Sequence, residues 1–308
     1  MLPKFLDFEY TKDEQMGIIA RGWNSDDDDI KKIHERAKQI FSNLTPYQKL
    51  QTARHPDRPY TLDYIKLLCG NNFFELHGDR LYGDDKAIIG GLGVIDGNRV
   101  MIIGHQKGRD ANSSSERNFG MAHPEGYRKA IRLMHMAEHF DIPIITFIDT
   151  PGAAPDDKAE ERGQSNAISE CLAEMSELRV PVLCFVIGEG GSGGALALGV
   201  GNKIYMFEHS VYSVISAEGC AAILWKDSEK TSEAAIQLKM CASDLLKAGF
   251  IDEIIEEPVG GAHRDYVAAA ESIKACILKD LPLLKNISAD ELIEQRYTKF
   301  RNFGLFKS

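Results

Sequence analysis

Residues 180–198 read VPVLCFVIGEGGSGGALAL, and this stretch decides the fold. The apolar run 180–187 predicts a buried strand, and the residues from Ala195 to Leu198 are compatible with a helix. Between them, Gly188–Gly194 contains five glycines, which let the main chain approach a ligand closely. The free N–H groups of a starting helix point outward at such a turn with the positive end of the helix dipole. The stretch therefore predicts a strand, an oxyanion-binding turn and a helix; the alternative is a tight turn whose glycines serve close packing.

The same order of helix and strand occurs just upstream. Apolar residues at helical spacing predict two helices, each followed by an apolar strand, at 142–148 and at 180–187. The apolar positions are Tyr127, Ala130, Ile131, Met134 and Ala137 in the first helix, and Ile168, Leu172, Met175 and Leu178 in the second. Pro143 and Pro181 begin the two strands at matching points. Repeated units of this kind imply a largely parallel sheet with functional loops at the carboxyl ends of its strands.

The flanking segments extend this plan. Apolar stretches at 87–95 and 100–104 flank Asp96-Gly97, a combination that predicts a β-hairpin. Further predicted strands are 204–207, 211–215 and 251–255. Residues 11–50 are predicted to be helical, and the acidic run Asp26–Asp29 is typical of a helix start.

Two more loops follow predicted strands. Asp149–Pro155 follows the strand at 142–148, and beside the glycine turn it would form a cleft, although a Thr-Pro-Gly-Ala sequence also marks ordinary turns. Gly104–Arg109 contains Lys107 and Arg109. It either binds a carboxylate, carbonyl or phosphate group or forms a basic surface turn.

The glycine turn also matches a serine hydrolase motif. Gly190–Gly194 fits G-x-S-x-G, in which Ser192 would be the nucleophile on a strand-to-helix turn. That chemistry needs a histidine base oriented by an acid, and the downstream candidates are His209 and His263. The hydrolase stays an alternative at this point.

A second short motif points to a metal. His135-Met136-Ala137-Glu138-His139 matches H-x-x-E-H, which places two imidazoles on one helical face. Both histidines continue the polar stripe of Arg128 and Arg132, so a solvent-facing pair is the favoured interpretation.

Composition limits the classes of function. The net charge of −10 argues against a nucleic-acid partner, because binding phosphate backbones depends on clustered Lys and Arg. The six cysteines are scattered without a C-x-x-C pair, which indicates reduced core residues and neither a disulfide framework nor a zinc ribbon. The absence of a long apolar run predicts no signal peptide, no membrane span and a cytoplasmic location.

Many segments of the chain resemble the carboxyltransferase alpha subunits of bacterial multi-subunit acetyl-CoA carboxylases. The likeness runs in order from about residue 44 to residue 304, without large gaps. It is densest in Ala159–Ser165, Gly188–Ala195, Glu218–Cys220, Ile223–Lys226, Glu257–Pro258 and Gly260–His263. It also includes Arg54–Pro56, Arg58–Tyr64, Gly78–Arg80, Asp84–Ala87, Gly104–Arg109, Arg117–Met121, Pro124–Lys129 and Ile148–Ala153.

This resemblance implies an α/β fold of the crotonase (ClpP/crotonase) type. Such a fold is a superhelix of β-β-α turns, here with helical N- and C-terminal extensions. The implied parts are a helical extension over 1–54, a crotonase-like carboxyltransferase domain over 55–262 and a helical extension over 263–308.

The resemblance also implies a function. The family transfers the carboxyl group of carboxybiotin, which is attached to a separate biotin carboxyl carrier protein, to acetyl-CoA, and so makes malonyl-CoA for fatty acid biosynthesis. The implied partners are a carboxyltransferase beta subunit in an alpha2-beta2 assembly and biotin carboxylase, with the active site at the subunit interface. The family's zinc ribbon belongs to the beta subunit, so no metal is expected in this chain.

The same resemblance assigns site residues. Gly193 and Gly194 are expected to be catalytic, because their positions match the family's oxyanion hole for carboxybiotin. The residues expected to bind substrate are Gly152, Ala153, Gly190, Gly191, Ser192, Lys107, Arg109, Glu218 and Gly219.

The chain departs from the family pattern in three places. Ala154 and Asp156–Lys158 replace an aromatic residue and a glycine-containing turn, 111–116 replaces a typically basic stretch, and Ala217 replaces a proline. These changes leave open a poorly active structural subunit of the same complex. A crotonase-type hydratase or isomerase that acts alone is the remaining enzyme alternative.

Overall fold

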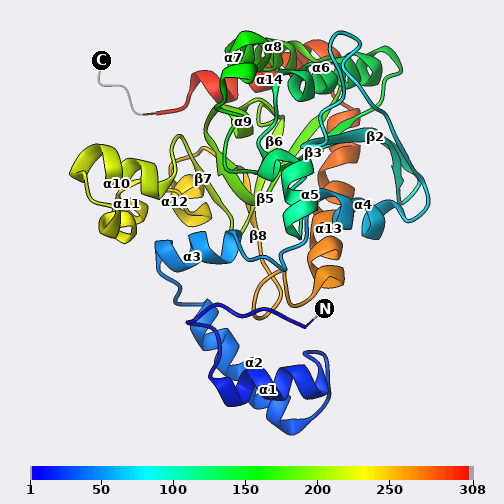
Figure 1. The fold of residues 1–308 in the computed structure, drawn as a ribbon. Helices are drawn as coiled ribbons and strands as arrows, with labels where there is room; N and C mark the ends of the chain where they lie inside the picture. Colours follow the sequence, from blue (N-terminus) through cyan, green and yellow to red (C-terminus); the bar gives the residue numbers. More distant parts are fainter. Residues whose placement is uncertain (1, 305–308) are drawn as a thin grey trace.

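The computed structural model describes residues 2–304, and across them eight strands form one sheet (Figure 1). The strand order is β1-β2-β3-β4-β5-β6-β8, and β7 pairs with β5 off this path. The strands are β1 Phe73–Glu75, β2 Ile88–Ile95, β3 Asn98–His105, β4 Ile144–Thr150, β5 Val182–Gly191, β6 Lys203–Phe207, β7 Val211–Ser213 and β8 Glu253–Ile255.

Helices precede, cover and follow this sheet. Those before and beside the first strands are α1 Lys12–Arg21, α2 Asp28–Phe41, α3 Pro46–Ala53, α4 Thr61–Cys69 and α5 Ala111–Glu116, with the 3-10 turn η1 Asn118–Gly120. The central ones are α6 Pro124–His139, α7 Asp157–Glu161, α8 Gln164–Glu177 and α9 Ser192–Leu196. The last ones are α10 Ala217–Trp225, η2 Ser228–Lys230, α11 Thr231–Gln237, α12 Ala242–Lys247, α13 Tyr266–Lys285 and α14 Ala289–Arg301.

The strand pairing confirms the predicted hairpin and parallel sheet. Strands β2 and β3 are antiparallel around Asp96-Gly97, where both residues have positive φ angles of 48° and 79°. Strands β3, β4, β5, β6 and β8 are parallel. Pro143 and Pro181 lie just before β4 and β5, and the carbonyl of Pro181 accepts a hydrogen bond from the Ile144 N–H at 2.8 Å. The loops that follow these parallel strands therefore gather at one edge of the sheet.

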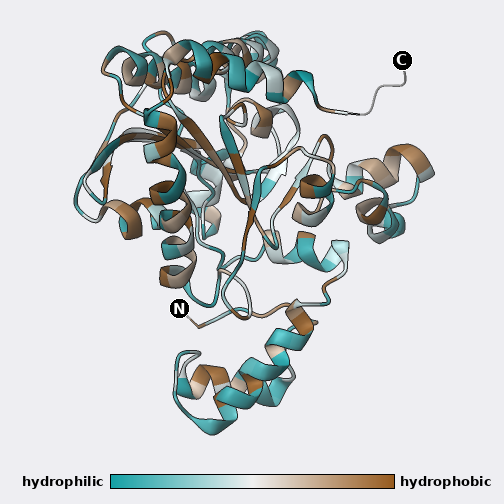
Figure 2. Ribbon diagram, turned by 180° about the vertical axis from the view of Figure 1, so that it is seen from behind, coloured by the Kyte–Doolittle hydropathy of each residue, from teal (hydrophilic) through white to brown (hydrophobic). Residues whose placement is uncertain are grey.

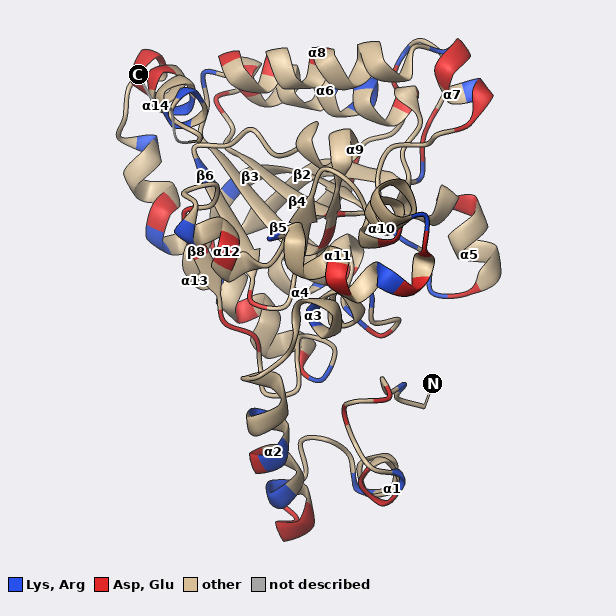
Figure 3. Ribbon diagram, turned by 90° about the vertical axis from the view of Figure 1, so that its left-hand side faces the viewer, with Lys and Arg blue, Asp and Glu red and all other residues tan. Residues whose placement is uncertain are grey.

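Alternating side chains along the central strands build two separate cores. Ile144 and Val182 face one core, which α6 and α8 cover, whereas Ile145 and Leu183 face the other, which α4 and α13 cover. Figure 2 shows long hydrophobic stretches along the central strands, and Figure 3 shows the charged residues mainly on the outer helices. All six cysteines are buried and free within residues 2–304, as predicted. No helix in that range combines the length and apolar composition of a membrane span.

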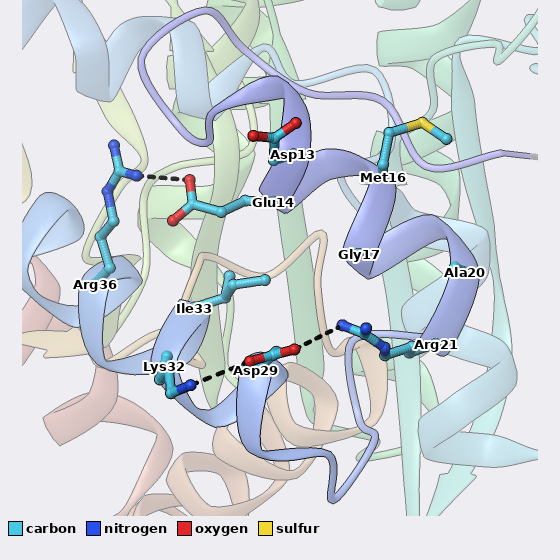
Figure 4. A pocket seen from close by; sticks show the side chains of 10 residues that line it. All are labelled: Asp13, Glu14, Met16, Gly17, Ala20, Arg21, Asp29, Lys32, Ile33 and Arg36. Atoms are coloured by element: carbon cyan, nitrogen blue, oxygen red, sulfur yellow. Dashed lines mark hydrogen bonds and ion pairs between the residues drawn. The ribbon is translucent and has the colours of Figure 1, made fainter.

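Helices α1 and α2 project from the body as a pair (Figure 1). The acidic run begins α2 as predicted, because the Asp27 carboxylate caps the helix by accepting the Asp29 N–H at 2.9 Å. A hollow of about 770 Å³ lies between the two helices (Figure 4). Ion pairs cross its rim, including Arg36 with Glu14 at 2.7 Å. Every residue that lines this hollow comes from 13–36, so it lies apart from the glycine turn in the sequence and belongs to the helix pair.

A buried polar cluster ties the N-terminal segment to the body. The Glu9 carboxylate lies 3.0 Å from His263 Nε2 and 2.5 Å from the Arg264 guanidinium. The His55 ring stacks on the His263 ring with centroids 3.8 Å apart. The predicted part boundaries at 54/55 and 262/263 therefore both fall on this cluster, which joins the three parts; the boundaries themselves stay a prediction.

This cluster predicts an acid-sensitive stability. Burial and the neighbouring His263 lower the pKa of His55 to about 3, whereas an unfolded histidine titrates near 6.5. Between these values the unfolded chain binds the proton and the folded chain does not, so stability is full above pH 6.5 and falls as pH drops toward 3. We expect His55 alone to lower the free energy of unfolding by about 2 kcal/mol between pH 7 and pH 5.

Urea unfolding at the two pH values measures this difference. His55→Asn keeps an oxygen that can accept the Asp57 N–H, which His55 Nδ1 accepts at 3.0 Å, and should remove the His55 share of the pH dependence. His135→Asn, at an exposed histidine, is the matched control and should keep it. An equal pH dependence in all three proteins would show that His55 is not the titrating group.

Candidate active site

The strand that leads into the glycine turn is longer than predicted, and the turn is correspondingly shorter. Strand β5 extends to Gly191, whereas the sequence predicted a strand that ends at 187. The reason is that Gly190 pairs with both Thr150 of β4 and Tyr212 of β7. A Cβ on Gly191 would lie 2.1 Å from the Pro151 carbonyl oxygen. Close packing therefore requires glycine at 190 and 191. For these two residues, the structure agrees with the alternative interpretation, in which the glycines of the loop serve close packing.

The turn itself consists of Ser192, Gly193 and Gly194. Ser192 is exposed and has a φ of +54°, a conformation that costs energy for a residue with a side chain. It begins the short helix α9, so the N–H groups of these three residues lie in a first turn, where a helix supplies no partners of its own. Gly193 is half-buried beside Ile168, with 3.6 Å between that side chain and a Cβ built on the glycine.

The structure brings the second predicted loop against this turn. A Cβ on Gly194 would lie 2.6 Å from the Ala153 nitrogen and 2.7 Å from the Gly152 carbonyl carbon. The Thr150 hydroxyl fixes that loop, because it lies 2.7 Å from the Gly152 carbonyl oxygen and accepts the Gly152 N–H at 3.1 Å. The two strand-end loops therefore share one wall, and a hollow of about 310 Å³ opens beside it. The hollow is lined by Ala154, Pro155, Asp156, Glu160, Gln164, Ser165 and Ile168.

A chain of ion pairs underlies the two loops. Lys107 pairs with the buried Asp149 carboxylate at 2.6 Å, and the same carboxylate accepts the Glu189 N–H at 2.9 Å. Glu189 pairs in turn with Arg54 at 2.5 Å, and Arg54 also pairs with Glu218 at 2.7 Å. Lys107 and Glu218, both predicted to bind substrate, are thus engaged in a network that fixes the ends of β4 and β5.

Two further residues predicted to bind substrate, Arg109 and Gly219, also have interaction partners within the chain. The Arg109 guanidinium pairs with Asp63 and lies over the Tyr60 ring at 4.5 Å. The Gly219 N–H donates to the Ser216 hydroxyl at 3.0 Å and so belongs to the cap of α10. In the described part of the chain, these contacts tie Arg109 to α4 and Gly219 to α10, and their predicted role toward substrate stays a prediction.

Sequence reasoning missed several polar residues of this region. His105 ends β3 fully buried, with the backbones of Gly194 and Phe147 nearby, and burial lowers its pKa to about 4. It is therefore neutral at pH 7. Asp149 and Thr150 carried a signal, because polar residues directly follow a predicted buried strand, whereas Arg54 was marked only by its place in the family-like segment Arg54–Pro56.

A family profile described as "Acetyl co-enzyme A carboxylase carboxyltransferase-like" matches residues 24–304. The acetyl-coenzyme A carboxylase carboxyl transferase subunit alpha of Xanthomonas campestris pv. campestris (strain B100) is 57% identical over 276 residues, which cover 90% of this chain and 86% of that protein. The subunit of the same name from Pasteurella multocida (strain Pm70) is 54% identical and is matched over 99% of both chains.

The chain belongs to the acetyl-CoA carboxylase carboxyltransferase family. Solved structures with lower identity support the fold. A Pseudomonas malonate decarboxylase hetero-tetramer in complex with coenzyme A has a TM-score of 0.60 at 16% identity, over 76% of this chain and 91% of that chain. Transcarboxylase 12S has a TM-score of 0.54 at 20% identity, over 70% of this chain and 41% of that chain. These neighbours confirm the predicted crotonase-like α/β fold.

Within this carboxyltransferase, Ser192 lacks the partners of a hydrolase nucleophile. The candidate base His263 is hydrogen-bonded to Glu9 in the N-terminal cluster, and His209 lies against the Phe41 ring with centroids 5.4 Å apart. Among residues 2–304, neither histidine forms a hydrogen bond with Ser192. The strained turn resembles a nucleophile elbow in its backbone alone.

Neither the His135–His139 motif of the carboxyltransferase nor its buried cluster of Glu9, His55 and His263 fits a metal centre. His135 and His139 are exposed, as predicted, and His135 pairs with Glu174 at 2.6 Å. In the buried cluster, the ligand atoms of Glu9, His55 and His263 lie within 4.8 Å of one another. However, His55 Nδ1 accepts the Asp57 N–H, so the neutral ring carries its proton on Nε2, the atom that would face the ion. The cluster therefore fits an anchor for the N-terminal segment.

The departures from the family pattern have structural counterparts. Residues 111–116 form the exposed helix α5, and a Cβ on Gly108 would lie 2.0 Å from the Ser114 nitrogen. Asp156 caps α7 and pairs with His123 at 3.0 Å. Ala217 is buried in the first turn of α10. None of these changed residues is among the nearest neighbours of Gly194, which are Ala153, Gly152 and Tyr127.

Proposed function

We propose that this carboxyltransferase alpha subunit moves the carboxyl group of carboxybiotin to acetyl-CoA through the main-chain amides of Gly193 and Gly194. The observation that carries the proposal is the position of Gly194, which fits against the Gly152–Ala153 loop with no space for a side chain. An N–H donor fixed in that way, with the neighbouring Gly193 N–H in the same helical turn, supports an oxyanion hole, whose donors must stay in place as charge develops.

The proposed chemistry needs few side chains. As carbon dioxide leaves the biotin nitrogen, negative charge grows on the ureido oxygen, and the two amides stabilise it. The freed nitrogen then takes a proton from the methyl group of acetyl-CoA, and the resulting enolate attacks carbon dioxide. Removal of one oxyanion-hole donor typically costs about 3–4 kcal/mol, so the glycine pair accounts for a large share of the rate.

Most of the other predicted site residues have supporting roles in this proposal. Gly152, Ala153, Gly190, Gly191 and Ser192 form the main-chain wall of the hole. Lys107 and Glu218 act through the ion-pair network, which fixes the ends of β4 and β5.

The proposed assembly follows the family. The partners are a zinc-ribbon beta subunit in an alpha2-beta2 complex, the biotin carboxyl carrier protein with its carboxybiotin, and biotin carboxylase, all in the cytoplasm. The beta subunit would supply the donors for the acetyl-CoA enolate, so the isolated chain should be inactive.

Co-expression with a zinc-ribbon beta subunit tests the function. We expect the two chains to co-purify and to make malonyl-CoA from acetyl-CoA only when the carboxylated carrier protein is present, with no turnover after avidin blocks the biotin. A stable complex without turnover would instead support a structural subunit. Activity of the isolated chain on an enoyl-CoA would support a hydratase or isomerase.

A further inference from the structure

A strained turn follows α5. Asn118, Phe119 and Gly120 have consecutive φ angles of 42°, 55° and 81°. Only the last residue is a glycine, and each non-glycine residue in this region costs on the order of 1–3 kcal/mol. Such conformations persist where the surrounding structure imposes them, and they cluster at functional sites.

Several contacts impose this conformation. The Gly120 carbonyl oxygen lies 2.7 Å from the Thr150 hydroxyl, and the Asn118 side chain donates to the Met121 carbonyl at 2.9 Å. On its other side Gly120 packs against the Lys107 stem, since a Cβ there would lie 2.7 Å from Lys107 Cγ. The turn is therefore held between the end of β4 and the side chain of Lys107.

The same contacts place the strained turn 118–120 next to the glycine turn 192–194. The Thr150 hydroxyl lies 2.7 Å from the carbonyl oxygens of both Gly120 and Gly152, and the Gly152 loop packs on Gly194. One threonine thus connects the strained turn to the wall of the proposed oxyanion hole.

This rigid turn presents an aromatic ring to solvent. Phe119 is 58% exposed, although its backbone is strained. Singly exposed apolar residues are common on protein surfaces, but this ring stands on a turn whose strain the surrounding contacts impose, and such strained turns cluster at functional sites.

We propose that Phe119 is a substrate-binding residue that packs against the fused rings of biotin. The proposal rests on the proposed function. With the ureido oxygen at Gly193 and Gly194, the rest of that small bicyclic ring system is apolar and must lie on the adjoining surface. The Lys107–Asp149 pair makes one side of that surface charged, and Phe119 supplies an aromatic face on the turn beside it.

The reverse reaction of the purified alpha-beta complex tests this assignment, with malonyl-CoA as carboxyl donor and free biotin as acceptor. We expect Phe119→Ala to raise the KM for biotin about tenfold, to leave the KM for malonyl-CoA unchanged and to leave the complex intact on gel filtration. Phe119→Trp should keep most of the affinity for biotin. Phe140→Ala removes a ring that is 63% exposed at the end of α6 and is the matched control, with no effect on either KM.

A second variant separates strain from contact. Asn118→Gly relieves one strained residue and removes the Asn118–Met121 hydrogen bond, but it keeps the ring and the contacts of Gly120 with Thr150 and Lys107, so it should leave the KM for biotin near the wild-type value. A rise in the KM for malonyl-CoA, or dissociation of the Phe119→Ala complex, would overturn the assignment in favour of coenzyme A or of the partner subunit. An active wild type with an unchanged biotin KM in Phe119→Ala would remove this assignment alone, whereas an inactive wild-type complex would remove the proposed function as well.

Discussion

Gly194→Ala is expected to lower carboxyl transfer by at least about a hundredfold, although it adds a single methyl group. That methyl carbon would lie 2.6 Å from the Ala153 nitrogen, 2.7 Å from the Gly152 carbonyl carbon and 2.9 Å from the Tyr127 hydroxyl. Two of these atoms belong to main chain that cannot rotate away, so the turn itself must shift. A shift removes the 194 amide from the ureido oxygen, and the loss of one such donor typically costs a hundred- to thousandfold in rate.

Steady-state assays of malonyl-CoA formation by the alpha-beta complex measure this effect. The loss should appear in kcat, with the thermal midpoint and the elution volume of the complex close to the wild type. Gly83→Ala is the matched control, because a Cβ there meets no atom within 4 Å. Wild-type turnover in Gly194→Ala would mean that the 194 amide takes no part in the reaction.

Arg58→Met is expected to lower the free energy of unfolding by about 3–5 kcal/mol. The Arg58 guanidinium and the Glu257 carboxylate are fully buried and share two hydrogen bonds of 2.9 and 2.6 Å. Arg58 also donates to the Ile187 carbonyl at 2.7 Å. Methionine matches the length of the side chain but leaves the Glu257 charge without its cation, and an unpaired buried charge is costly.

Urea unfolding at pH 7 measures the loss. Arg179→Met is the control, because Arg179 is 54% exposed and its ion pair with Asp290 should contribute less than about 1 kcal/mol. Burial alone would raise the pKa of Glu257. The positive charge of Arg58 and the hydrogen bonds that the Glu257 carboxylate accepts instead lower this pKa to about 2, from an unfolded value near 4.5. This contribution is therefore present above pH 4.5 and is lost as pH falls toward 2, and Arg58→Met should weaken that dependence. Equal losses in the two methionine variants would contradict the role given to the buried pair.

The regular elements were predictable because their signals are local. Two apolar strands after two amphipathic helices, with Pro143 and Pro181 in equivalent positions, were sufficient to predict β4 and β5 as strands of a largely parallel sheet. The Asp96-Gly97 hairpin and the acidic start of α2 were likewise confirmed. The glycine run marked the turn at 192–194, and the position of Asp149–Pro155 directly after a predicted strand marked the loop that this turn contacts.

The ends of elements and the polar contacts were less predictable because they depend on distant residues. Strand β5 continues to Gly191 because β7 pairs with it, and β7 in turn ends at Ser213, two residues before the predicted stretch does. Arg54 meets Glu189 across 135 positions of sequence, and no periodic pattern announces such a pair. The strain at Phe119 could not be predicted either, because the local sequence Arg117–Met121 does not require a positive φ. The contact with Thr150 imposes it.

The glycines at 188, 191 and 194 each leave space for one atom group of the segment 149–153, respectively the Asp149 carboxylate, the Pro151 carbonyl and the Ala153 nitrogen. The two segments are therefore complementary in shape at these three positions. Anyone who grafts a foreign 188–194 segment into this scaffold must therefore transplant 149–153 with it. Homologous recombination between relatives should preserve the two as a single inherited block, even though about forty residues of sequence separate them.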